Sequence, residues 1–130
     1  MKLAIFGAAF LVAAGLAGSD AFAMDDAAFC TQVKTVVDSE NAKGSYDIDA
    51  VTKAVGANYD CGTKSVEFKR TIAATQDQMK EGWRDLLLSQ WNQLLCADPS
   101  SKEAVQSGWT LTDTFTLTDG VTYSAKANCP

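Results

Sequence analysis

The residues of this chain that could do chemistry are carboxylates, because the sequence contains no histidine. Without histidine, neither a Ser-His-Asp or Cys-His nucleophilic site nor the usual zinc ligand sets can form. A pair of carboxylates suffices for glycoside hydrolysis, and Glu67, Glu81 and Asp85 are the nearest candidates. Carboxylates of this kind usually lie on a solvent-exposed surface without a catalytic role. We therefore predict a protein that is not an enzyme and needs no cofactor.

A metal site is not indicated either. Asp47 and Asp49 have the spacing that opens a calcium-binding loop, but the glycine and the closing glutamate of an EF-hand do not follow. The four cysteines contain no Cys-x-x-Cys pair, which argues against a zinc knuckle and against a redox-active dithiol.

The cysteines instead predict two disulfides, as an even number of them does in a small exported chain. Our first expectation is Cys30–Cys61 together with Cys96–Cys129. The pairing Cys61–Cys96 with Cys30–Cys129 is the alternative, because the expected topology brings three of the four cysteines to one end of the domain.

Two charged residues interrupt apolar strand patterns, Arg70 in the segment 66–72 and Asp113 in the segment 109–117. One interpretation is a charged pair that lines a ligand cleft. The other is a structural ion pair, or a local bulge that turns Asp113 outward.

Hydroxyl side chains alternate with apolar ones near the C-terminus, which predicts a sheet with one uncharged polar side. Such a side suits a protein partner, a glycan or ice, and it is also the ordinary composition of the wet side of an antiparallel sheet. The candidate binding residues are therefore Thr112, Thr114, Thr116, Ser124 and Lys126, with Arg70 and Asp113.

Export is predicted by the first 23 residues. Lys2 supplies a positive charge, an apolar stretch runs to Gly18, and Ala21-Phe22-Ala23 has the small residues of a signal-peptidase site. We expect cleavage after Ala23, no membrane anchor afterwards, and a single domain over residues 24–130 in a periplasm or outside the cell. That remainder has ten Lys and Arg against fifteen Asp and Glu, and this acidic balance argues against a nucleic-acid partner.

Helices are predicted in four places. The first begins at Asp25 or Asp26 and ends before Gly44, with Phe29, Val33, Val36 and Val37 on one stripe. A short helix capped by Asp47 would carry Ile48, Val51 and Val55 and stop at Gly56. A long central helix begins at Thr75, where Gln78 completes a capping box, and ends at Asp98-Pro99; its wide apolar arc predicts cover on more than one side. A last helical turn spans 101–107.

Strands are predicted at 66–72, with a continuous helix as the alternative there, and in a C-terminal hairpin. A three-residue loop at 118–120 pairs Leu117 with Val121 and Phe115 with Tyr123, which puts the apolar residues on one side. A two-residue turn would instead place Leu117 opposite Thr122. The fold class is α+β, a small antiparallel or mixed three-stranded sheet in which the hairpin packs on the long helix, with further helices at the N-terminus.

These features favour an exported domain that binds another protein, such as an inhibitor, an immunity protein or a secretion assembly factor. The alternatives are a module that binds a glycan or a small ligand, and a small carboxylate-dependent glycan hydrolase. Sequence alone leaves the partner and the oligomeric state open.

Overall fold

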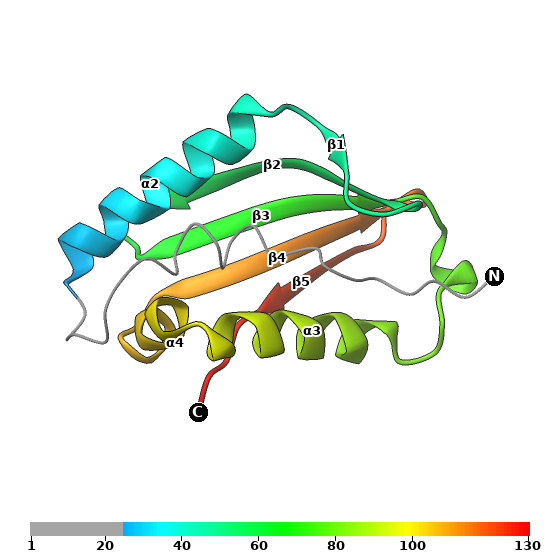
Figure 1. Ribbon diagram of the computed structural model, residues 1–130. Helices are drawn as coiled ribbons and strands as arrows, with labels where there is room; N and C mark the ends of the chain where they lie inside the picture. The colour runs from blue at the N-terminus through cyan, green and yellow to red at the C-terminus, as the bar shows by residue number, and fades with distance from the viewer. Residues whose placement is uncertain (1–24) are drawn as a thin grey trace.

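The computed structural model describes residues 25–130, and the predicted signal peptide lies outside them. The chain is α+β, with its elements in the order α-β-β-β-α-α-β-β rather than the predicted α-α-β-α-β-β (Figure 1). The helices are α2 (Asp26–Ala42), α3 (Trp83–Ala97) and α4 (Pro99–Gln106), with a 3-10 turn η1 (Gln76–Gln78). The strands are β1 (Tyr46–Asp47), β2 (Thr52–Asp60), β3 (Ser65–Ile72), β4 (Thr110–Leu117) and β5 (Thr122–Lys126).

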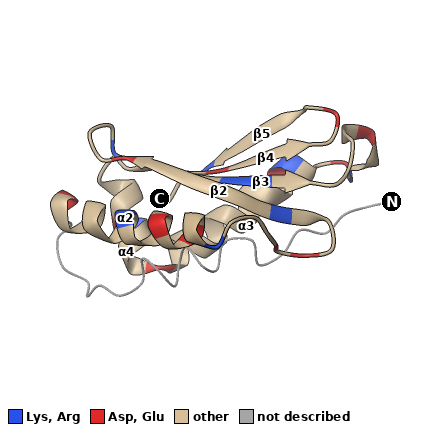
Figure 2. Ribbon diagram, turned by 90° about the horizontal axis from the view of Figure 1, so that it is seen from above, with Lys and Arg blue, Asp and Glu red and all other residues tan. Residues whose placement is uncertain are grey.

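The sheet has five strands in the order β1-β2-β3-β4-β5, so the prediction of three strands was too small. Strands β3 and β4 run parallel, and all other neighbours are antiparallel. The parallel pair requires a crossover connection, which α3 and α4 provide. Figure 2 shows the three described helices on one side of the sheet, so no helix of residues 25–130 covers the other side.

The predicted short helix after Asp47 is wrong, because this part of the chain forms β1 and β2. Its apolar residues looked helical because β2 contains a bulge between Ala54 and Gly56, which inserts one residue into the two-residue repeat of a strand. Ala54 points into the core before the bulge, and Ala57 and Tyr59 pack against the core after it. Val55 is left 40% exposed at the bulge itself.

The hairpin forms in the predicted register. Phe115 pairs with Tyr123, and the Leu117 N–H donates to the Val121 carbonyl at 2.8 Å. Gly120 has φ +85°, the left-handed conformation that the three-residue loop requires. The strand predicted at 66–72 is also confirmed over the alternative of a continuous helix, and its parallel partner is β4.

The helices agree with the sequence in part. Asp25 caps α2, since its side chain accepts from the Ala27 N–H, and the helical turn near 101–107 is α4. The capping box of Thr75 closes only η1, and α3 begins later, after Gly82 with φ +79°. The cover predicted on several sides of α3 is wrong: its buried residues form one stripe, and Leu86 is 38% exposed.

The core lies between the sheet and the helices in two clusters. The first core cluster joins α2 and α3 to the sheet and includes Phe29, Val33, Trp91, Leu95 and Leu111. The second core cluster includes Ile72, Met79, Trp83, Phe115 and Leu117.

Both disulfides form with the pairing expected first. Cys30–Cys61 ties α2 to the turn between β2 and β3, and Cys96–Cys129 ties the end of α3 to the segment after β5.

Candidate binding surface

The side of β4 and β5 that faces away from the helices carries the predicted hydroxyl residues. Alternation along both strands brings Thr112, Thr114 and Thr116 together with Ser124 and Lys126, since Thr112 pairs with Lys126 and Thr114 with Ser124. We call this side of the two strands the hydroxyl face. Its members are Thr110, Thr112, Thr114, Thr116, Thr122, Ser124 and Lys126.

A row of side-chain hydrogen bonds crosses four strands on this side of the sheet. The Thr114 hydroxyl donates to Glu67 Oε2 at 2.6 Å and lies 3.0 Å from the Ser124 hydroxyl. Asn58 Nδ2 donates to the other oxygen, Glu67 Oε1, at 3.4 Å. A hydroxyl has one proton, so Ser124 must donate to Thr114 while Thr114 donates to Glu67. The row therefore fixes hydroxyl orientations before any partner arrives, which lowers the entropy cost of binding.

Aromatic side chains do not contribute to the hydroxyl face. Within residues 25–130, every Phe, Trp and Tyr packs with the two core clusters or, for Tyr46, against Glu40. Single-stranded nucleic acids are bound largely through stacking on aromatic rings, which the hydroxyl face lacks in the described residues.

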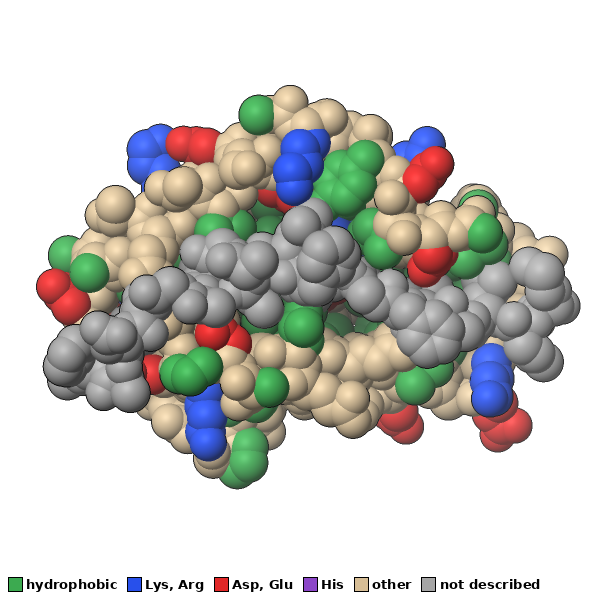
Figure 3. All heavy atoms as spheres, in the orientation of Figure 1, with side chains coloured by type: hydrophobic (Ala, Val, Ile, Leu, Met, Phe, Trp, Pro, Cys, Tyr) green, Lys and Arg blue, Asp and Glu red, His purple; other side chains and the backbone are tan. Residues whose placement is uncertain are grey.

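The charged side chains that can be seen on the helical side are scattered around the outline of the molecule and do not gather into one basic patch (Figure 3).

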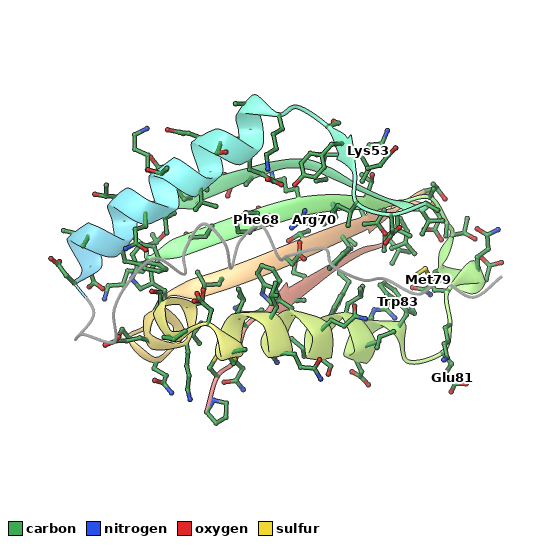
Figure 4. The ribbon with its side chains drawn as sticks, in the orientation of Figure 1. Lys53, Phe68, Arg70, Met79, Glu81 and Trp83 are labelled. Atoms are coloured by element: carbon green, nitrogen blue, oxygen red, sulfur yellow. A yellow bond between two sulfur atoms is a disulfide. The ribbon has the colours of Figure 1, made fainter. Side chains whose placement is uncertain are left out.

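Arg70 and Asp113 lie on the opposite, helical side of the sheet, so they do not join the hydroxyl face. Figure 4 shows Arg70 next to Phe68 on β3, on the side that bears the helices. Arg70 Nε donates to Asp113 Oδ1 at 2.9 Å, and Arg70 Nη1 lies 3.7 Å from Glu40 Oε2. Arg70 and Asp113 are 2% and 1% exposed, which confirms an ion pair and favours its structural interpretation over a cleft open to ligands.

Glu40 and Tyr46 complete this buried charged network, and the sequence interpretation missed both. The Tyr46 hydroxyl donates to Glu40 Oε2 at 2.5 Å, and burial, followed by that hydrogen bond, raises the pKa of Tyr46 to about 12. A signal for Glu40 was present: it follows Phe29, Val33 and Val37 by eleven, seven and three residues, so it lies on the buried stripe of α2. A carboxylate at such a position needs a buried partner.

The network gives Asp113 an unusual titration. Burial raises the pKa of Asp113 to about 6, against the opposing effect of the Arg70 charge. The folded chain then holds a proton on Asp113 that the unfolded chain has lost between about pH 4 and pH 6, so this residue makes stability fall as pH rises through that window.

We therefore expect the stability difference between the wild type and Asp113→Asn to shrink as pH rises from 4 to 6. Other carboxylates titrate in the same range, but they are shared by both proteins and cancel in the difference. Chemical denaturation at several pH values measures it. A difference that grows over this range would mean that the Arg70 charge outweighs burial.

Glu67 does not come together with Glu81 or Asp85, the other two candidate catalytic carboxylates. Glu67 points away from the helices and binds Thr114, whereas Asp85 lies on α3, on the other side of the sheet. Glu81 lies just before α3, and its side chain points away from the sheet (Figure 4). Asp47 lies 3.9 Å from Lys53, and Asp49 accepts from the backbone N–H groups of the turn before β2. Residues 25–130 contain no group of three or more side chains suited to a metal ion.

Comparisons with known proteins give a fold and no family. No family model matches the chain, and the search of curated proteins finds no relative. A solved structure with the same fold is that of a Pseudomonas aeruginosa protein provisionally assigned as secreted, with 16% identity and a TM-score of 0.57. The match covers 76% of this chain and 89% of that one. In the described part of the chain, no helix is both long enough and apolar enough to cross a bilayer.

Proposed function

We propose that this chain is an exported, non-enzymatic domain that binds another protein through the hydroxyl face. The observation that carries the proposal is a sheet side without helical cover, on which a hydrogen-bonded row already orients Glu67, Thr114 and Ser124. Fixed donors and acceptors on a rigid sheet are what a partner can match at low entropy cost.

Export is supported by three independent features. Residues 1–23 have the three parts of a signal peptide, and both disulfides belong to an oxidising compartment such as a periplasm or the extracellular space. The Pseudomonas aeruginosa protein of similar fold is itself provisionally assigned as secreted. Export does not distinguish between the kinds of partner.

A protein partner is favoured over a glycan because the hydroxyl face has no aromatic ring in the described structure. Sugars present apolar C–H faces that pack well against aromatic rings, and uncharged hydroxyls alone bind them weakly in competition with water. The separation of Glu67 from Asp85 supports the non-enzymatic part of the proposal, since two-carboxylate hydrolysis needs both groups at one bond.

The test is a double variant in which Thr114 and Thr116 are both replaced by lysine. Two charges on the hydroxyl face would have to be desolvated in the complex, so capture of a partner by the immobilised mature protein should fall by about tenfold or more. Both positions lie on β4, which is paired on both sides, and not on the edge strand β5. Quantitative pulldown from an extract of exported proteins measures the capture.

The matched control adds the same charge to the helical side, through Ser89→Lys with Gln93→Lys on exposed positions of α3. The control should capture the partner as the wild type does. Equal loss in both double variants would assign the effect to net charge, and full capture by the Thr114/Thr116 variant would remove the hydroxyl face from the binding site.

A further inference from the structure

Strand β5 has an open edge with a regular set of backbone groups. It pairs only with β4, and the hydrogen bonds from Leu117 N–H to Val121 and from Ala127 N–H to Leu111 set the alternation. Odd-numbered residues of β5 therefore direct their N–H and C=O groups to β4. The N–H and C=O groups of the even-numbered residues point to the free edge; these are Thr122, Ser124 and Lys126.

The opposite edge of the described sheet is shorter and partly covered. Strand β1 pairs with the first part of β2, through Tyr46 opposite Ala54. Beyond β1, the Asn41 side chain of α2 binds both backbone groups of Ala57, accepting from its N–H and donating to its C=O, each at 2.9 Å. Strand β5, with five residues against two in β1, is therefore the longer free edge of the described sheet. Pairing of β5 with β5 uses the same edge of both copies, so it closes at two copies.

We propose that two copies of this chain pair antiparallel through their β5 edges, with the two-fold axis at Ser124. This is the two-fold register that pairs all five residues of β5, and it joins two five-stranded sheets into one. It places Thr122 opposite Lys126 of the second copy, so no like charges face each other. On the helical side it places Tyr123 opposite Ala125, a large side chain beside a small one. A register centred on Lys126 would instead oppose two lysines.

The helix α3 holds β5 in place from one side and would flank the two-fold axis. The Tyr123 ring packs on Trp83 with ring centres 5.8 Å apart, and Asn92 Oδ1 accepts from the Asn128 N–H at 2.8 Å. Leu88 is half-buried and lies on the flank of α3 between Asp85 and Asn92, which are one turn away on either side. Figure 1 shows α3 running beside β5, so the helices of the two copies would cover each other's Leu88.

The dimer would be weak and reversible, because five-residue edges and one helix flank bury less than the roughly 1,200 Å² of a stable interface. Its consequence for the proposed function is geometric. The hydroxyl faces of both copies would meet at the axis and form one continuous surface with two equivalent binding positions.

Sedimentation velocity of the mature, disulfide-bonded chain from about 10 μM to 1 mM tests the proposal, since weak interfaces of this class associate in that range. The wild type should shift from monomer toward dimer with concentration. Ser124→Pro should abolish the shift and keep the hairpin, because it removes an N–H that β4 does not use. Ser124→Lys should weaken association at least about tenfold by opposing two charges at the axis.

Thr116→Lys is the matched control, with the same charge added to the same face but on β4, and it should dimerise as the wild type does. A wild type that stays monomeric at 1 mM, or a dimer that survives both Ser124 substitutions, would overturn the proposal. The outcome is separate from the proposed function: loss of partner capture in the Thr114/Thr116 variant leaves dimerisation unchanged, and a monomeric wild type leaves partner binding through the hydroxyl face intact.

Discussion

Replacing Arg70 with methionine should lower the free energy of unfolding by about 3 to 5 kcal/mol. The substitution keeps an apolar side chain of similar length on β3 but removes the cation that faces Glu40 and Asp113. Asp113, 1% exposed, then loses its ion-pair partner, and Glu40, 5% exposed, keeps the weaker contact of 3.6 Å from its Oε1 to Lys43 Nζ. Uncompensated buried charge is among the few single changes that cost this much.

Equilibrium denaturation in urea at pH 7 measures this loss. Lys69→Met is the matched control, because Lys69 is the exposed neighbour on the other side of the same strand and should change stability by less than about 0.5 kcal/mol. A loss below about 1 kcal/mol for Arg70→Met would mean that the buried charged network contributes little. Arg70→Met combined with Asp113→Leu should recover part of the loss, and retained partner capture by that variant would confirm that the pair has only a structural role.

Removing either disulfide should cost about 3.5 to 4 kcal/mol, because each closes a loop of similar length in the unfolded chain. The sequence separations are 31 residues for Cys30–Cys61 and 33 for Cys96–Cys129. Replacing both cysteines of one pair with alanine and measuring chemical denaturation gives the value for that pair. Replacing all four should leave the domain largely unfolded at 37 °C, because the combined loss of about 7 to 8 kcal/mol lies within the roughly 5 to 15 kcal/mol that stabilises a typical domain.

The two single-pair variants control for each other. Both bridges close loops of similar length, so similar losses are expected. A loss near zero for one pair would mean that the packing around Phe29 and Trp109, whose ring centres are 4.8 Å apart, already holds that end together without the bridge.

Each strand could be predicted from the sequence only where its alternation of apolar and polar residues keeps the two-residue spacing. The hairpin was predictable to the register, because apolar and hydroxyl residues alternate from Thr110 to Leu117 with Asp113 as the one exception, and Asp113 keeps the two-residue spacing. Strand β2 was not, because the bulge at Val55 shifts its alternation by one residue, and the remaining spacing of Ile48, Val51 and Val55 imitates a helix. Because β1 and β2 were not predicted, the sequence indicated a three-stranded sheet where the structure has five strands.

The start of α3 shows a second limit. Thr75 and Gln78 have the capping-box spacing of a helix, but that box serves equally well for the single 3-10 turn that forms there. The left-handed Gly82 then separates this turn from α3. A glycine inside an expected helix was therefore the informative residue, and it was outweighed by the apolar periodicity on either side of it.

The candidate site was predictable on one side of the sheet and not on the other. Alternation alone placed Thr112, Thr114 and Ser124 together, because neighbouring strands in a known register fix which side chains share a face. The two ion-pair partners of Arg70 come from α2 and β4, and only Asp113 could be proposed from strand patterns. Contacts between a helix and a distant strand, such as Glu40 with Arg70, depend on tertiary packing that no local pattern encodes.

The most direct test of binding through the hydroxyl face is photo-crosslinking in the exporting cell. A photoreactive amino acid is placed at Thr116 on the hydroxyl face or at Ser89 on the exposed side of α3, and adducts are identified by mass spectrometry. We expect one dominant protein adduct from Thr116 and no adduct of that protein from Ser89. The same adduct from Ser89 and not from Thr116 would contradict it, because the partner would then bind the helical side of the sheet.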